Sequence, residues 1–124
     1  AVYATQILGA SLVNASATAN YIKQLSPEIV TLVAMGYRAE CSADEDLLCA
    51  RYIRDLLNGL HPDISNNIRQ LRTGSGSRFF DPANVKHSPP TDFFLCTDLN
   101  RFNFALNALV NDNGHAEIFK IDIK

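Results

Sequence analysis

Paired cysteines are missing from this chain of 124 residues, which contains three cysteines in all. Cys41, Cys49 and Cys96 form an odd set without a Cys-x-x-Cys pair, so neither a disulfide framework nor a zinc site of known spacing is supported. A nucleophilic role for Cys96 would need His87 or His115 close by, and no sequence spacing indicates this. We therefore interpret the cysteines as reduced thiols.

Signals for membranes, nucleic acids and nucleotides are also lacking. No apolar run approaches the ~20 residues needed to span a bilayer, and the first residues, AVYATQILGAS, lack the basic region of a signal peptide. The formal charge is −2, and the eleven basic residues are scattered rather than clustered. Neither a GxGxxG motif nor a P-loop lysine occurs. We expect a cytoplasmic protein that binds neither nucleic acid nor membrane.

The first third of the chain predicts a βαβ unit. With 47% hydrophobic residues, the length suits one domain spanning 1–124. The short apolar run at Ile7–Gly9 predicts a strand, and Asn14 precedes an alanine-rich helical pattern that Ser26-Pro27 ends. Ile29–Met35 is apolar apart from Thr31, which is typical of a strand buried on both faces. A right-handed crossover would make the two strands parallel and end them at one edge of the sheet.

The remainder predicts two more helices and a hairpin. Helical spacing runs from Ser42 until Gly59 and Pro62 break it, and Pro62-Asp63 can open another helix through Leu71. Asn113-Gly114 predicts a type I′ turn between strands at 104–110 and 116–123. The predicted fold is therefore three-layer α/β/α with a mixed, partly parallel sheet and a C-terminal β-hairpin.

The acidic stretch SADEDLL, residues 42–48, has two interpretations. In the first, Ser42 and Glu45 form a capping box, and the carboxylates of Asp44 and Asp46 favour the positive end of a helix. In the second, the loops after the two predicted strands converge on a crevice at the sheet edge, where α/β proteins bind ligands. Carboxylates would repel a phosphate at that helix start unless Mg²⁺, which prefers oxygen ligands, bridged the two.

Three stretches resemble the 2-phosphosulfolactate phosphatase family. They are ILGASLVNA at 7–15, VAMG at 33–36 followed by SADEDLLCA at 42–50, and DFFLCTDLNRF at 92–102. The resemblance implies a magnesium-dependent phosphatase that hydrolyses 2-phospho-3-sulfolactate, a small phosphorylated acid, in coenzyme M biosynthesis. It implies Glu45 and Asp46 as ligands of Mg²⁺ and Asn14 and Gly36 as substrate-binding residues. Arg38, the basic residue of the predicted crevice loops, is our further candidate for substrate binding.

The family's amino-terminal half is absent from this chain, including a valine-aspartate-valine-leucine-arginine-alanine motif expected in the phosphate site. The resemblance therefore implies the C-terminal portion of a longer phosphatase chain that is inactive in isolation. We expect its partner to be its own N-terminal half or further copies of the chain in a homo-oligomer. The alternative is a noncatalytic α/β module that binds a small anion or a partner chain.

Overall fold

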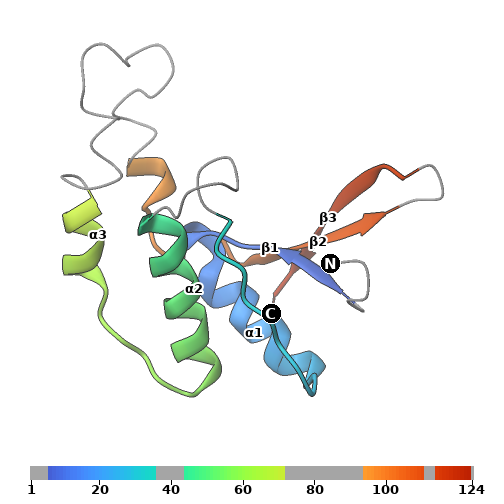
Figure 1. The fold of residues 1–124 in the computed structure, drawn as a ribbon, viewed down its shortest axis with the longest axis horizontal. Coiled ribbons are helices and arrows are strands. Elements are labelled where there is room, and N and C mark those ends of the chain that lie inside the picture. The colour runs from blue at the N-terminus through green and yellow to red at the C-terminus, as the bar shows by residue number, and fades with distance from the viewer. Residues whose placement is uncertain (1–5, 36–43, 72–93, 111–113, 124) are drawn as a thin grey trace, which may run out of the picture.

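The computed structural model describes residues 6–35, 44–71, 94–110 and 114–123, which contain three labelled α-helices, one 3-10 turn, three strands and a helical turn at 94–96 (Figure 1). In chain order these elements are β1 (Ile7–Gly9), η1 (Leu12–Asn14), α1 (Ala15–Leu25), α2 (Asp44–Leu57), α3 (Ser65–Leu71), β2 (Phe104–Val110) and β3 (Ala116–Asp122). Within these residues no helix is both long and apolar enough to cross a membrane.

The helices begin and end where local chemistry requires. Helix α1 ends at Leu25, and the next residue, Ser26, adopts a left-handed conformation with φ 49° and donates its N–H to the carbonyl of Ile22 at 3.1 Å. Helix α3 starts beside Asp63, whose carboxylate accepts the backbone N–H of Ser65 at 3.0 Å. This bond supplies a partner for one of the free N–H groups at a helix start. The predicted end of α1 at Ser26-Pro27 and start of α3 at Pro62-Asp63 are confirmed.

The sheet has the order β1-β2-β3 with both pairings antiparallel. Ile7 lies opposite Ala108 on β2, and Ala105 lies opposite Ile121 on β3. Gly114 has a φ of 80°, a conformation that costs glycine little, and the predicted C-terminal hairpin is confirmed. The fold is thus mixed helix and strand, while the three-layer arrangement and the partly parallel sheet are not confirmed.

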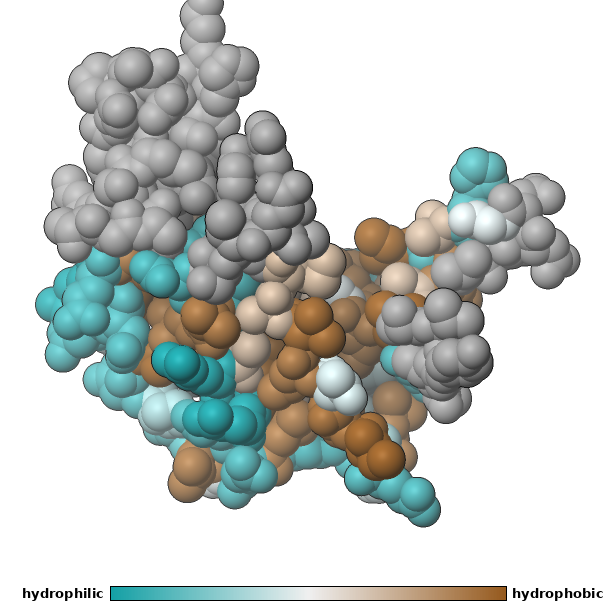
Figure 2. Space-filling view, viewed as in Figure 1, coloured by the Kyte–Doolittle hydropathy of each residue, from teal (hydrophilic) through white to brown (hydrophobic). Residues whose placement is uncertain are grey.

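The strand predicted at 29–35 is wrong, and with it the parallel βαβ unit. This segment has no regular secondary structure and pairs with no strand among the described residues. Leu32 packs against the helical core, whereas Ile29 and Val33 are 82% and 69% exposed. The run is hydrophobic as a strand should be, but hydrophobicity does not provide the neighbouring backbone that a strand needs. Hydrophobic surface is correspondingly visible across the middle of the molecule (Figure 2).

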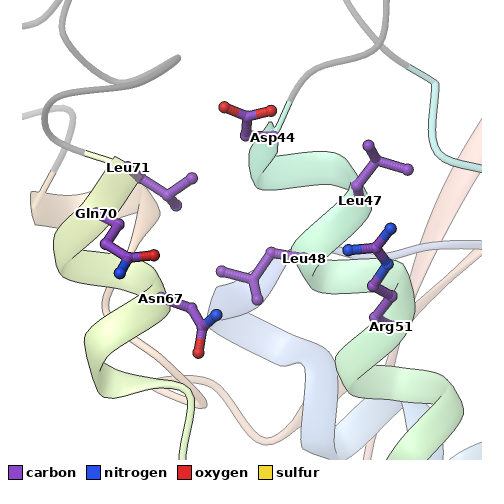
Figure 3. A pocket seen from close by; sticks show the side chains of 7 residues that line it. All are labelled: Asp44, Leu47, Leu48, Arg51, Asn67, Gln70 and Leu71. Atoms are coloured by element: carbon purple, nitrogen blue, oxygen red, sulfur yellow. The ribbon is translucent and has the colours of Figure 1, made fainter.

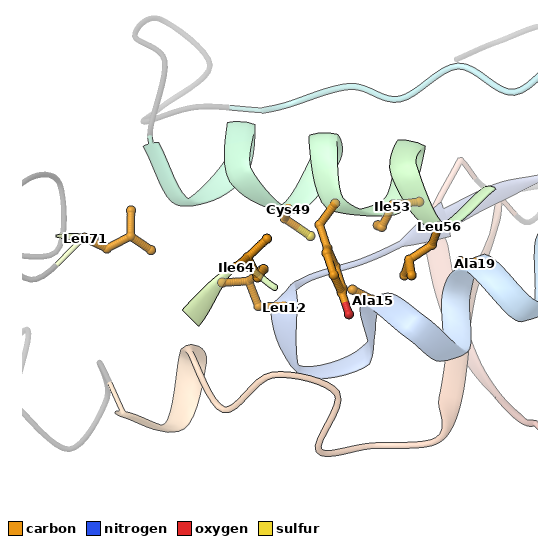
Figure 4. Close-up of a cluster of buried hydrophobic side chains, with 9 residues drawn as sticks. Leu12, Ala15, Ala19, Cys49, Ile53, Leu56, Ile64 and Leu71 are labelled. Atoms are coloured by element: carbon orange, nitrogen blue, oxygen red, sulfur yellow. The ribbon is translucent and has the colours of Figure 1, made fainter. Parts of the chain in front are cut away.

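Helix α1 lies between the sheet and α2, and two hydrophobic clusters form on its two sides. On one side Ala15 and Ala19 face a cluster from α2, α3 and η1, which is shown in Figure 4. On the other side Ala17 packs with Ala105 and Ile123 of the hairpin. The small side chains explain this position, because alanine lets a helix approach packed surfaces on both sides without overfilling either.

Candidate functional site

Helices α1 and α2 run side by side in the same direction, with the start of α1 level with the middle of α2. Figure 4 shows this: Ala15 and Ala19 of α1 follow the same direction as Cys49, Ile53 and Leu56 of α2. Helix starts carry free N–H groups and a partial positive charge. The start of α1 and the acidic start of α2 are therefore separate points along the helix pair.

Asn14 directly precedes α1 and is turned into the protein. Its side chain is 2% exposed. Its Oδ1 accepts the N–H of Ser11 at 2.9 Å, and its Nδ2 donates to the carbonyl of Phe104 at 3.4 Å. Its own carbonyl accepts the hydroxyl of Thr18 at 2.8 Å. Asn14 therefore joins the start of α1 to strand β2, and its contact with substrate stays a prediction.

Asn100 also contacts the start of α1, although no sequence pattern identified it as a site residue. Its Oδ1 accepts the N–H of Ser16 at 2.9 Å, its Nδ2 donates to the hydroxyl of Tyr52 on α2 at 2.9 Å, and its backbone N–H donates to Leu12. Its φ of 58° is a left-handed conformation that asparagine tolerates better than most residues. One residue thus fixes the starts of η1 and α1 against α2. Sequence offered one signal, an asparagine between a helical turn and a strand, and no hint of its distant partners.

The acidic turn of α2 consists of Asp44, Glu45 and Asp46. Asp44 is exposed, whereas Glu45 and Asp46 are half-buried and both have interaction partners. Negative charge at this position is favourable beside the positive end of the helix, in agreement with the structural interpretation. The capping box itself needs Ser42, which lies outside the described residues, as do the predicted substrate contacts Gly36 and Arg38.

The acidic turn carries oxygen donors of the kind that a magnesium ion prefers. Among the described residues no group of three His, Cys, Asp or Glu side chains is arranged to hold a metal ion. Mg²⁺ needs less than such a cage, because one or two carboxylates with water and substrate phosphate complete its shell. Glu45 and Asp46 supply oxygen donors of that kind on one helical turn. The donor chemistry is of the kind that Mg²⁺ takes, and the metal role of Glu45 and Asp46 stays a prediction.

Cys49 is a buried thiol one turn beyond Asp46. Burial raises its pKa to about 11, and the negative charge of Asp46 acts in the same direction. A thiol with this pKa is almost entirely protonated near neutral pH and is a poor nucleophile. Cys49 therefore serves packing, as part of the cluster between α1 and α2. Cys96 is exposed.

A pocket of about 230 Å³ lies between α2 and α3. Leu48 and Leu71 extend toward each other across it, and Asp44 stands at the first turn of α2 above them (Figure 3). Arg51, Asn67 and Gln70 are among its polar lining residues. Asp44 is the residue of the acidic turn that lines this pocket. The pocket therefore does not bring the predicted site residues Asn14, Glu45 and Asp46 together.

Comparison with known proteins supplies a family. The model of the family described as 2-phosphosulpholactate phosphatase matches residues 1–74. This range contains all five predicted site residues and ends before the stretch at 92–102, whose resemblance therefore has no support from the match. No curated protein and no solved structure matches the chain.

Proposed function

The chain belongs to the 2-phosphosulpholactate phosphatase family, and we propose on this basis that it contributes a magnesium-binding turn to a phosphomonoester hydrolase. The proposed substrate is a small phosphorylated acid, of which 2-phospho-3-sulfolactate is the example that the family name supplies. The match over residues 1–74 is the observation that carries the proposal, because it includes the whole of α1 and the acidic turn.

Glu45 and Asp46 would hold the metal. When bound, Mg²⁺ neutralises phosphoryl oxygens and lowers the pKa of a coordinated water. The two carboxylates lie in the first turn of α2, where the helix start reduces the cost of placing negative charges close together. Their half-buried position limits the screening of their charge by water.

The start of α1 would orient the substrate. Asn100 accepts a hydrogen bond from the N–H of Ser16 and donates one to the hydroxyl of Tyr52, and these bonds hold this helix start against α2. Asn14, Gly36 and Arg38 are our proposed substrate contacts. For Asn14 such a contact would involve its Nδ2, whose 3.4 Å bond to Phe104 is the longer of its two side-chain hydrogen bonds.

The test uses the intact native protein, assayed against a panel of 2-phospho acids with and without Mg²⁺. Glu45→Gln and Asp46→Asn remove one charge each while keeping size and hydrogen-bonding ability. We expect at least one of them to lower magnesium-dependent turnover more than tenfold, about 1.4 kcal/mol in the barrier. Asp55→Asn is the matched control, because Asp55 lies near the other end of α2 in an ion pair with Arg54.

A second measurement separates metal binding from folding. The melting temperature of the wild-type protein should rise with added Mg²⁺, since a ligand that binds only the folded state stabilises it. This rise should shrink in Glu45→Gln or Asp46→Asn and persist in Asp55→Asn. Full turnover in both site variants would show that the acidic turn is only a helix start. No hydrolysis by the wild-type protein would favour the noncatalytic anion-binding module.

A further inference from the structure

Strand β3 is an edge strand with unusual exposure. Among the described residues the order β1-β2-β3 gives it a single neighbour, and Figure 1 shows the hairpin of β2 and β3 extending away from the helices. All seven residues of β3 except Ile121 are exposed, with Ile118 at 67% and Phe119 at 45%. Exposed edge strands offer free N–H and C=O groups to another strand.

The register shows which groups are free. The N–H of Ile123 donates to the carbonyl of Asn103 at 2.9 Å, so these two residues form a hydrogen-bonded pair. Hydrogen-bonded and non-hydrogen-bonded pairs alternate along an antiparallel ladder. The residues of β3 that bond to β2 are therefore the odd-numbered ones. The backbone groups of Ala116, Ile118, Lys120 and Asp122 point away from β2 toward the free edge.

We propose that β3 pairs with β3 of a second copy of this chain, antiparallel and in the register that places Phe119 opposite its own counterpart. Phe119 is the central residue of the strand, so a two-fold axis at this point overlaps all seven residues. Ala116 then lies opposite Asp122 of the second copy, and Ile118 lies opposite Lys120. Every outward-pointing backbone group on β3 gains a partner.

Side chains support the same register. Each charged residue lies directly opposite an uncharged one, since Glu117 faces Ile121, Lys120 faces Ile118 and Asp122 faces Ala116. The two phenylalanines form a close, non-hydrogen-bonded pair, and aromatic cross-strand pairs contribute ~0.2–1 kcal/mol relative to alanine. A shift of two residues toward the C-terminus would place Lys120 opposite Lys120 and lose part of the hydrogen bonding.

Of the two edges of the sheet, the one formed by β3 is suited to pairing with a second copy of the chain. Strand β1, at the other edge, has only three residues, too few for a comparable ladder. Pairing through β3 would join two three-stranded sheets into one of six strands and reduce the exposure of Phe119 on one face and Ile118 on the other. The inference is independent of the proposed phosphatase activity.

The first experiment measures self-association of the full chain by sedimentation velocity over a range of concentrations. Ile118→Pro removes an N–H that points to the free edge, so the ladder with β2 keeps its bonds. We expect it to weaken dimerisation at least tenfold, whereas Ile118→Thr, which keeps the N–H, should weaken it less. A wild-type chain that stays monomeric throughout overturns the proposal, and so does a dimer unaffected by the proline.

The second experiment tests the register without a proline. In a background carrying Cys41→Ser and Cys96→Ser, Phe119→Cys places two thiols opposite each other at the proposed axis. It should form a disulfide-linked dimer on mild oxidation. Glu117→Cys is the matched control, because it lies on the same face but opposite Ile121 and is too far from its own counterpart. No cross-link at 119, or an equal one at 117, overturns the register.

Discussion

Replacing Asn100 should destabilise the fold for two reasons that can be measured separately. The residue makes two side-chain hydrogen bonds, and it adopts a left-handed backbone conformation that most other residues adopt only at a cost. Its side chain bonds to the N–H of Ser16 and the hydroxyl of Tyr52, both at 2.9 Å. Hydrogen bonds of this kind contribute about 1 kcal/mol each. Asn100→Gly removes both bonds and keeps the left-handed conformation, so we expect a loss of about 2 kcal/mol in the free energy of unfolding.

Asn100→Ala adds the cost of the conformation. Placing alanine at a φ of 58° costs roughly 1 kcal/mol more, so this variant should lose about 3 kcal/mol. Tyr52→Phe removes one of the two bonds and should lose about 1 kcal/mol. In a double-mutant cycle, Asn100→Gly and Tyr52→Phe should show a coupling energy of about 1 kcal/mol.

Urea unfolding followed by circular dichroism measures the free energy of unfolding of the wild type, the three single variants and the double variant. The slope of each transition shows whether the variants unfold in the same way as the wild type. Two results would refute the reasoning. One is an Asn100→Gly variant within about 0.5 kcal/mol of the wild type, since the bonds would then contribute nothing. The other is an alanine variant as stable as the glycine variant, since the left-handed backbone would then carry no cost.

Three further predictions concern single groups. The pKa of Cys49 is raised from 9.0 to about 11, so its neutral thiol stabilises the fold below pH 9 and this stabilisation is lost between pH 9 and 11. The free energy of unfolding of Cys49→Ala, measured in urea, should therefore fall less over that pH range than that of the wild type. Hydrogen bonds from the hydroxyl and N–H of Ser65 lower the pKa of Asp63, so Ser65→Ala should raise that pKa in an NMR titration, and an unchanged value would contradict the assignment. Thr18→Val removes a buried hydroxyl bonded to the carbonyl of Asn14 and should cost about 1 kcal/mol in thermal unfolding, whereas Thr18→Ser keeps the bond.

The helices were predictable because their signals are local. Ser26-Pro27, Gly59 and Pro62-Asp63 each act within one turn of the helix end they specify, and the structure confirms the ends near them. The hairpin was predictable for the same reason, since Asn113-Gly114 encodes both the turn and the antiparallel direction of its strands. In these cases the sequence window contains every group that takes part.

The sheet topology was not predictable, because it depends on groups far apart in the chain. The apolar run at Ile29–Met35 was interpreted as a parallel strand, but strand formation needs a neighbouring backbone that composition does not report. Strand β1 instead pairs with β2, about a hundred residues later in the chain. Local patterns therefore predicted strand-like segments better than they predicted the pairs those segments form.

The candidate site shows the same division. The acidic turn of α2 was visible in sequence, and Glu45 and Asp46 remain its predicted ligands. Asn100 was not visible as a site residue, because its partners Ser16 and Tyr52 are 84 and 48 positions away. The burial of Asn14 was equally hidden, since its amide bonds to a carbonyl 90 positions later.

The place of α1 between two hydrophobic clusters has a consequence for how the molecule unfolds. Ala15 and Ala19 belong to the helical cluster, while Ala17 belongs to the cluster with the sheet, so neither cluster is complete once α1 is gone. The helices and the hairpin therefore cannot melt as separate units. Amides in α1 should exchange with deuterium only through global opening and record the stability of the whole domain.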